Sequence, residues 1–408
     1  MKAGRILGLA IAGLIGFVAL YLLGAWLRLY GDNEDAGSPT EVRVPADVVA
    51  ARQRAEQRAA ASLTSAPSRQ ILFGDLHVHS TFSTDAFLWS LPMVQGDGAH
   101  PISDACDYAR FCSGLDFWSI NDHAEASTPR KWRETKRAIR ECQAVAGDEA
   151  SPDVAVFLGW EWSQVGLTAE DHYGHKNVIV RGLGEEAVPA RAIGAGGLAT
   201  RGLRGAVGVP WVLPLLDLRN RDRYYDFIHF MEEVKETPYC DGDVPSPELS
   251  DECYESAATP AELFAKLREW DDRGVETLVI PHGNTWGFYS PPGISWDKQL
   301  VGAMHDPEQQ FLIEVMSGHG NSEEYRDWRA ARFGADGNPI CPEPTPEYQP
   351  SCWRAGEITL QRCLEAGEPL EVCQERAAQA RRFYVEGGAA GYHAVPGTEF
   401  EEWLGSGQ

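Results

Sequence analysis

The chain has 408 residues, of which 43% are hydrophobic and 24% are charged, which is ordinary for a globular protein with a sizeable core. The formal net charge of -24 argues against a nucleic-acid partner, because binding a phosphate backbone requires stripes of lysine and arginine. Length and charge are compatible with one large domain with decoration or with two smaller domains.

An uncharged apolar run, residues 6–27, comes first along the chain, behind Lys2 and Arg5. It is long enough for a helix that spans a bilayer. The basic residues before it predict, by the positive-inside rule, that the bulk of the chain lies outside the cytoplasm, in a periplasmic or extracellular space. We therefore expect a signal anchor over residues 1–30 that attaches the protein to the membrane. A cleaved signal peptide, which would leave a secreted protein, is the alternative.

The next segments are a polar linker at 31–44 and an Ala/Arg-rich helix at 46–62, which together fill residues 31–69. From residue 71 onward, short apolar runs alternate with helical stretches, of which 129–146 and 260–273 are the clearest. The runs are 71–79, 115–123, 154–162, 175–180, 277–284 and 311–320. This alternation predicts an α/β domain over 70–340, with a parallel sheet that is either open or closed into a barrel.

Residues 341–408 are rich in proline, glutamate and cysteine, and we expect a helical appendage there, with its helix within 354–385. The nine cysteines show no CxxC spacing, which favours disulfides in an oxidising compartment over a zinc site. The pairs closest in sequence are Cys106–Cys112, Cys240–Cys253, Cys341–Cys352 and Cys363–Cys373. Cys142 is left over, and it could instead replace one member of the first pair.

Histidines and carboxylates gather at the ends of the predicted strands. In GDLHVHSTFSTD, alternation along a strand puts Asp75, His77 and His79 on one face. Other runs end with further candidates, which are Asp122, His123, Glu161 and His282. Because the carboxyl ends of strands in α/β folds meet at one edge, these side chains are expected to converge into a metal site. His175 opens its strand and would have to reach that edge from a connecting segment.

Four motifs resemble those of the PHP (polymerase and histidinol phosphatase) superfamily: GDLHVHSTFSTD, INDHAE, GWEW followed by HKN, and IPHGN. The last two are similar to the motifs of an uncharacterised bacterial branch of that superfamily. The resemblance runs from about residue 71 to residue 325. It implies a distorted (β/α) barrel with a metal site at the C-terminal ends of the strands.

The resemblance also implies roles for particular residues. Glu161 would bridge two ions, Asp122 would fix the orientation of a ligating imidazole, and His172 would be a nearby donor or a plain loop residue. Asp122 and His172 are thus the candidate catalytic residues. The implied metal ligands are His77, His79, Asp85, His123, Glu161, His175 and His282.

The sequence lacks one motif of the PHP superfamily. PHP proteins complete the site with a DxH pair near the C-terminus. Here His393 is the sole histidine after His319, and Gly391 stands where the aspartate would be. Either the chain is truncated or the last part of the site is built differently, and two ions are expected rather than three. Mixed nitrogen and oxygen ligands suit zinc, manganese or iron.

The expected activity is hydrolysis of a small-molecule phosphoester, by a phosphatase or phosphodiesterase that uses two or three divalent ions and a metal-bound hydroxide. Lys176 would add a phosphate contact or remain a solvated lysine. Two alternatives stay open. One is an amidohydrolase-type metal-dependent hydrolase, although its bridging carboxylated lysine has no candidate at a strand end. The other is a metal-binding or ligand-binding module without turnover.

Overall fold

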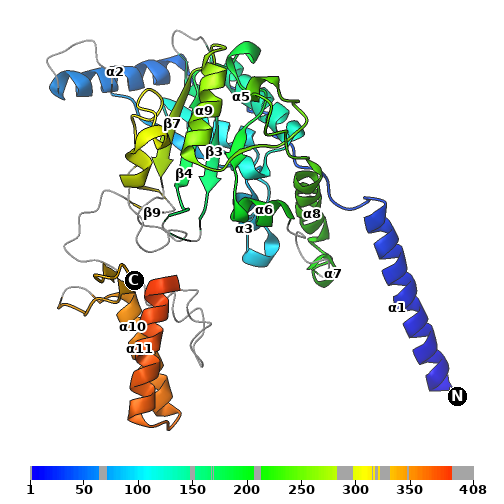
Figure 1. The fold of residues 1–408 in the computed structure, drawn as a ribbon. Helices are drawn as coiled ribbons and strands as arrows, with labels where there is room; N and C mark the ends of the chain where they lie inside the picture. The colour runs from blue at the N-terminus through cyan, green and yellow to red at the C-terminus, as the bar shows by residue number, and fades with distance from the viewer. Residues whose placement is uncertain are drawn as a thin grey trace.

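A five-stranded sheet lies at the centre of the computed structural model, with the strand order β1-β2-β3-β4-β7 (Figure 1). The strands are β1 (Gly74–Val78), β2 (Phe117–Ile120), β3 (Ala155–Gln164), β4 (Gly174–Val180) and β7 (Thr277–His282). The residues that the structure describes are 2–63, 71–147, 152–166, 168, 170–205, 213–282, 297–314, 316–317, 320–321, 331–346 and 349–387.

The strand directions in this sheet are mixed. β1, β2 and β3 are parallel, whereas β4 is antiparallel to both β3 and β7. The connection between β3 and β4 spans only residues 165–173, and a parallel return needs a crossover of about a dozen residues or more. The expectation of a parallel sheet is therefore wrong at β4. As a result, the start of β4 lies at the same edge as the ends of β3 and β7.

The predicted closed barrel is also corrected. Among the described residues the sheet is a half barrel with β1 and β7 at its two edges. The predicted strand at 311–320 is reduced to the two-residue β8 (Met316–Ser317), which pairs with β9 (Gly320–Asn321). Closing a barrel requires every strand to be paired on both sides, and β8 and β9 pair only with each other.

Helix α1 (Lys2–Trp26) contains most of the apolar N-terminal run. In the described part of the chain, no helix combines the length and the apolar character needed to cross a membrane, so the predicted transmembrane span is wrong. The last turns of α1 instead provide a packing surface. Tyr21 and Ala25 are buried there, and Tyr21 stacks on Tyr30 with 5.1 Å between the ring centres.

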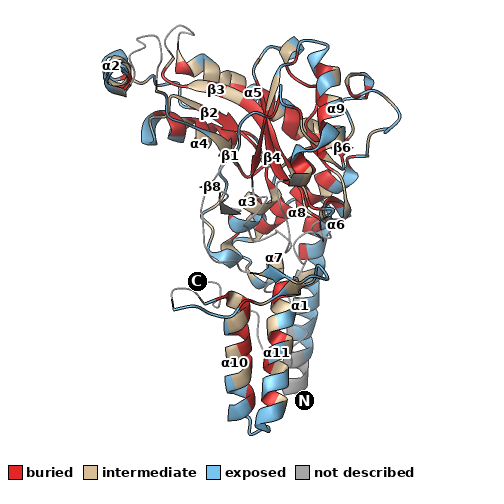
Figure 2. Cartoon of the chain, turned by 60° about the vertical axis from the view of Figure 1, so that its left-hand side comes forward, coloured by how far each residue is buried: buried red, intermediate tan, exposed pale blue. Residues whose placement is uncertain are grey.

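Two helices, α5 (Pro129–Ala146) and α9 (Pro260–Asp271), share one hydrophobic core with the sheet. Each begins with a Thr-Pro pair. Thr128 and Thr259 accept a hydrogen bond from a backbone N–H of the first turn, and proline suits the first helical position. The ring of Trp132 on α5 meets that of Trp160 on β3 edge to face at 5.7 Å. In Figure 2 the buried residues follow the strands and the inner faces of these helices.

Most of the remaining elements lie around this core, and the C-terminal helices lie apart from it (Figure 1). The further α-helices are α2 (Ala46–Leu63), α3 (Thr84–Trp89), α4 (Ile102–Asp107), α6 (Leu198–Gly205), α7 (Leu213–Leu216), α8 (Arg221–Glu236), α10 (Ser351–Glu365) and α11 (Leu370–Gly387). The short strands are β5 (Ile193–Ala195), β6 (Glu255–Ala257), β10 (Arg332–Phe333) and β11 (Pro339–Ile340).

The predicted helical appendage is a hairpin of α10 and α11 that lies apart from the sheet (Figures 1 and 2). The single helix expected within 354–385 is interrupted after Glu365, because Gly367 has a φ of +81°, a backbone conformation that ends helices. The disulfides Cys341–Cys352 and Cys363–Cys373 hold this part of the chain together, as predicted.

The disulfides of the body are Cys240–Cys253, as predicted, and Cys106–Cys142. The Cys106–Cys112 pair favoured by sequence proximity is wrong, and Cys112 is free and exposed. Helices α4 and α5 pack side by side, which brings the Cα atoms of Cys106 and Cys142 to 6.1 Å within the core. Four disulfides indicate an oxidising, extracytoplasmic environment.

Candidate metal centre

Five histidines surround the side chain of Glu161 at one edge of the sheet. His77 is close to the end of β1 and His79 follows it, while His123 lies just after β2 and forms an isolated bridge with Glu161 on β3. His175 is the second residue of β4 and lies opposite His282, the last residue of β7. The antiparallel course of β4 therefore brings His175 to the site directly, without help from a connecting segment.

The two oxygens of the Glu161 carboxylate face different sets of imidazoles. Its Oε2 atom lies 3.2 Å from Nε2 of His77 and 3.0 Å from Nε2 of His79. Its Oε1 atom lies 2.6 Å from Nδ1 of His175, 3.3 Å from Nε2 of His282 and 3.5 Å from Nδ1 of His123. Glu161 thus divides the site into two halves and borders both.

The electrostatics of the cluster favour a bound cation. Glu161 is fully buried, and no lysine or arginine in the described part of the chain forms an ion pair with it. Although burial opposes ionisation, the surrounding histidines hold the pKa of Glu161 well below its usual range. Burial would also lower the pKa of His77, but Glu161 and Glu314 outweigh it and raise that pKa to about 10. Burial lowers the pKa of His282 to about 4.

The donor atoms have the spacing that a metal ion requires. Two groups of three contain Glu161, one with His77 and His79 and the other with His175 and His282, and the ligand atoms within each group lie within 4.8 Å of one another. Nε2 of His77 and Nε2 of His79 are only 3.0 Å apart, so both can point at a single ion. These residues could therefore hold metal ions on both sides of Glu161. Imidazole and carboxylate ligands suit zinc, manganese or iron.

Asp85 and Asp122 take different places in the cluster. Asp85, in the first turn of α3, lies with Oδ2 at 3.1 Å from Nε2 of His123. Burial raises the pKa of Asp85, yet the hydrogen bond to His123 keeps this pKa below its usual range. Asp122 accepts hydrogen bonds from the backbone N–H and hydroxyl of Ser80 and from the hydroxyl of Ser83, so it anchors the loop after β1.

Ser83 links Asp122 to the imidazole of His79. Because the Ser83 hydroxyl donates to Asp122, its oxygen is left to accept from Nδ1 of His79 at 2.9 Å and from the backbone N–H of His123 at 3.0 Å. A proton on Nδ1 leaves the Nε2 lone pair of His79 directed at Glu161, where an ion would lie. The predicted orienting role of Asp122 would thus act through Ser83.

His172 is buried, and its Nδ1 atom accepts a hydrogen bond from the backbone N–H of Gly166 at 3.3 Å. Burial, with a smaller contribution from His175, lowers the pKa of His172 to about 4. The hydrogen bond of His172 is to the β3–β4 connection, and its catalytic role stays a prediction.

We expect His172 to make stability dependent on acidity. In the unfolded chain the pKa of His172 is about 6.5, whereas in the folded protein burial lowers this pKa to about 4. Its contribution is therefore complete above pH 6.5 and is lost as the pH falls toward 4, by about 2 kcal/mol at pH 5. Urea unfolding of chelated protein at pH 8 and pH 5 measures this loss. The His172→Gln variant should lose less stability than the unchanged protein over that interval, and equal losses would contradict the assignment.

Lys176 does not fit either role expected from the sequence. Neighbouring residues of a strand face opposite sides of the sheet, so Lys176 points away from the side where His175 meets Glu161. It is completely buried and donates a hydrogen bond to Oε1 of Gln299 at 2.5 Å. Burial lowers its pKa to about 7. Lys176 is therefore neither a solvated lysine nor a contact at the metal centre.

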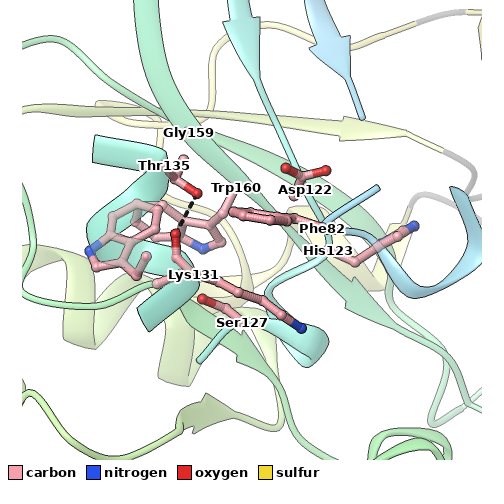
Figure 3. A pocket seen from close by; sticks show the side chains of 10 residues that line it. Phe82, Asp122, His123, Ser127, Lys131, Thr135, Gly159 and Trp160 are labelled. Atoms are coloured by element: carbon pink, nitrogen blue, oxygen red, sulfur yellow. Dashed lines mark hydrogen bonds between the residues drawn. The ribbon is translucent and has the colours of Figure 1, made fainter. Parts of the chain in front are cut away.

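A small pocket lies behind the centre, lined in part by Phe82, Lys131 and Trp160 (Figure 3). Figure 3 shows that the imidazole of His123 extends away from its aromatic wall. The ammonium of Lys131 donates to the backbone oxygen of Ala126 at 3.1 Å and lies over the ring of Phe230. Asp122 and His123 also line this pocket, so it adjoins the metal centre on the side of the core.

Glu314 is a neighbour of the site that the sequence did not indicate. Its Oε2 atom lies 2.9 Å from Nδ1 of His77 and 3.9 Å from Nδ1 of His282. Its signal in the sequence is a single acid inside the apolar run FLIEVM, away from the end of that run, where ligands are expected. His319 and His393 lie outside the described residues.

Comparison with models of protein families, with curated proteins and with solved structures finds no match for this chain.

Proposed function

We propose that this protein is a metal-dependent hydrolase of phosphoesters, built on a PHP-like site. The observation that carries the proposal is the division of imidazoles between the two oxygens of Glu161. A carboxylate placed in this way suits two ions a few ångströms apart, which is the arrangement used to hydrolyse phosphoesters. The four sequence motifs that resemble the PHP superfamily support the same reading.

The exposure of the side chains indicates where a substrate would approach. The side chain of His282 is completely buried and that of His175 is 6% exposed, whereas His79 is 20% and Asp85 is 43% exposed. The open side of the centre is therefore the side of the β1–α3 loop. Bound ions would lower the pKa of a shared water and neutralise the charge of the phosphoryl group. They would also attract an anionic substrate to a protein whose net charge is -24.

The protein's own residues would keep the centre in shape during this chemistry. Glu161 holds the two halves at a fixed separation, and Asp122 and Ser83 keep the loop that carries His79 in place. The amidohydrolase alternative requires a lysine as the bridging ligand. Lys176 points to the other side of the sheet, so no specific observation favours that alternative.

The test is elemental analysis of the full chain, purified without chelator, together with an assay on an aryl phosphate and a bis-aryl phosphate. We expect about two zinc, manganese or iron ions per chain and release of the aryl group. In the His77→Ala/His79→Ala double variant, the ion bound to both side chains and the hydrolysis should be lost together. His100→Ala, a change at an exposed histidine, is the matched control. A folded protein that binds no metal, or one that binds both ions and hydrolyses neither ester, would contradict the proposal.

A further inference from the structure

Glu314 lies on the far side of two imidazoles from Glu161. Nε2 of His77 and Nε2 of His282 face the Glu161 carboxylate, at 3.2 Å and 3.3 Å. The opposite nitrogen of each ring, Nδ1, faces Glu314, at 2.9 Å for His77 and 3.9 Å for His282. His77 belongs to the Oε2 half of the centre and His282 to the Oε1 half, so one carboxylate stands behind a histidine of each half.

The surrounding chain holds this carboxylate in place. The backbone N–H of Glu314 donates to the oxygen of Pro281 at 3.1 Å, and the N–H of Val279 donates to the oxygen of Gln309 at 2.9 Å. Residues 309–314 therefore run alongside the end of β7. The amide of Asn177 on β4 donates to Oε2 of Glu314 at 3.4 Å. The contacts with Pro281 on β7 and Asn177 on β4 hold Glu314 in place, and only 20% of its side chain is exposed.

A carboxylate in this position determines which nitrogen of a histidine is available to a metal ion. A histidine that binds a metal through Nε2 carries its proton on Nδ1, and a hydrogen bond from that N–H to a carboxylate fixes both the tautomer and the ring orientation. For His77 both oxygens of Glu314 are within 3.0 Å of Nδ1. For His282 the 3.9 Å separation is too long for a hydrogen bond, so Glu314 would orient this ring only through the attraction between its charge and the N–H at Nδ1.

We propose that Glu314 is a positioning residue shared by the two halves of the metal centre, which orients His77 and His282 so that both present Nε2 to the ions. The inference rests on the proposed metal-dependent function. It differs from a role as an ordinary ligand, for which His77, His282 and Glu314 would surround one ion of their own. A ligand of one ion affects that ion alone, whereas a shared positioning residue affects the binding of both.

The experiment measures the dissociation constants of both zinc ions, by competition with a chromogenic chelator, in the full chain and in Glu314→Ala. Loss of an outer carboxylate weakens metal binding by about 10-fold to 100-fold, and we expect this loss for both ions. Glu314→Gln keeps one acceptor oxygen for the N–H of His77 and should lose less affinity than Glu314→Ala. Glu308→Gln, at an exposed position of the same segment, is the control and should bind both ions normally.

A second readout does not depend on affinity. Nitrogen-15 NMR of the zinc-loaded, unchanged protein should show His77 and His282 protonated on Nδ1 and coordinated through Nε2. Unchanged affinity for both ions in Glu314→Ala, or loss of one ion with the other bound normally, would overturn the inference. An unchanged protein that binds both ions but hydrolyses no phosphoester would reject the proposed function and leave this inference intact.

Discussion

The Glu161→Gln substitution is expected to release both ions from the centre and to remove hydrolysis of aryl phosphates. Each oxygen of Glu161 faces its own set of imidazoles, so a neutral amide in its place removes the shared charge from both halves at once. Changes to outer carboxylates of metal sites cost about 10-fold to 100-fold in affinity or activity. Because Glu161 would contact both proposed ions directly, its loss should cost more than that, and the metal content should fall for both ions together.

The measurement is elemental analysis and turnover of Glu161→Gln beside Glu276→Gln, whose exposed side chain pairs with Arg181 on the surface. Circular dichroism of both variants checks that the fold is kept. The control should retain both ions and full activity. If Glu161→Gln keeps one ion at its normal affinity, Glu161 belongs to a single half of the centre, and the bridging role assigned to it is wrong.

The Cys106→Ala/Cys142→Ala double variant, which lacks the Cys106–Cys142 disulfide, is expected to lose more unfolding free energy than the other variants. The bond closes a loop with a sequence separation of 36, for which the chain-entropy relation gives about 4 kcal/mol. Both cysteines are completely buried between α4 and α5, in the core that supports β2 and β3. For a domain of this size, such a loss lowers the melting temperature by roughly 10 °C.

Cys112→Ala is the control that separates the two possible pairings of Cys106. Cys112 is free and exposed in the structure, so its replacement should change the unfolding free energy by less than about 0.5 kcal/mol. Thermal unfolding of the two variants under non-reducing conditions gives the comparison. A Cys112→Ala variant as unstable as the double variant would show that Cys106 pairs with Cys112 in solution, as the short spacing in sequence had suggested.

The strands and the histidines near their ends could be predicted from the sequence because each depends on local patterns. The alternation in GDLHVH and the apolar run before GWEW define strands by themselves, and the residues that follow them point to the site edge. The direction of β4, in contrast, depends on the length of the connection at residues 165–173, which is too short for a parallel return. The expectation that every ligand follows the carboxyl end of a strand is therefore wrong for His175. Because β4 runs antiparallel to β3 and β7, its first residues lie at the same edge as the ends of those strands.

Contacts between distant segments account for most of what the sequence did not indicate. Glu314 reaches His77 across 237 positions of the chain, and no spacing rule connects them. Cys106 bonds to Cys142 and not to the nearer Cys112, because the packing of α4 on α5 decides which sulfurs meet. Lys176 was expected to face a substrate or solvent, but strand alternation and Gln299 place it on the buried side. In each case tertiary packing determined the outcome.

Anomalous X-ray diffraction from crystals of the protein loaded with manganese or zinc tests most directly whether two ions flank the Glu161 carboxylate. Two anomalous peaks are predicted, one among Glu161, His77 and His79 and the other among Glu161, His175 and His282. A single peak bound by one oxygen of Glu161, or the absence of any peak at this edge of the sheet in metal-loaded crystals, would contradict the account.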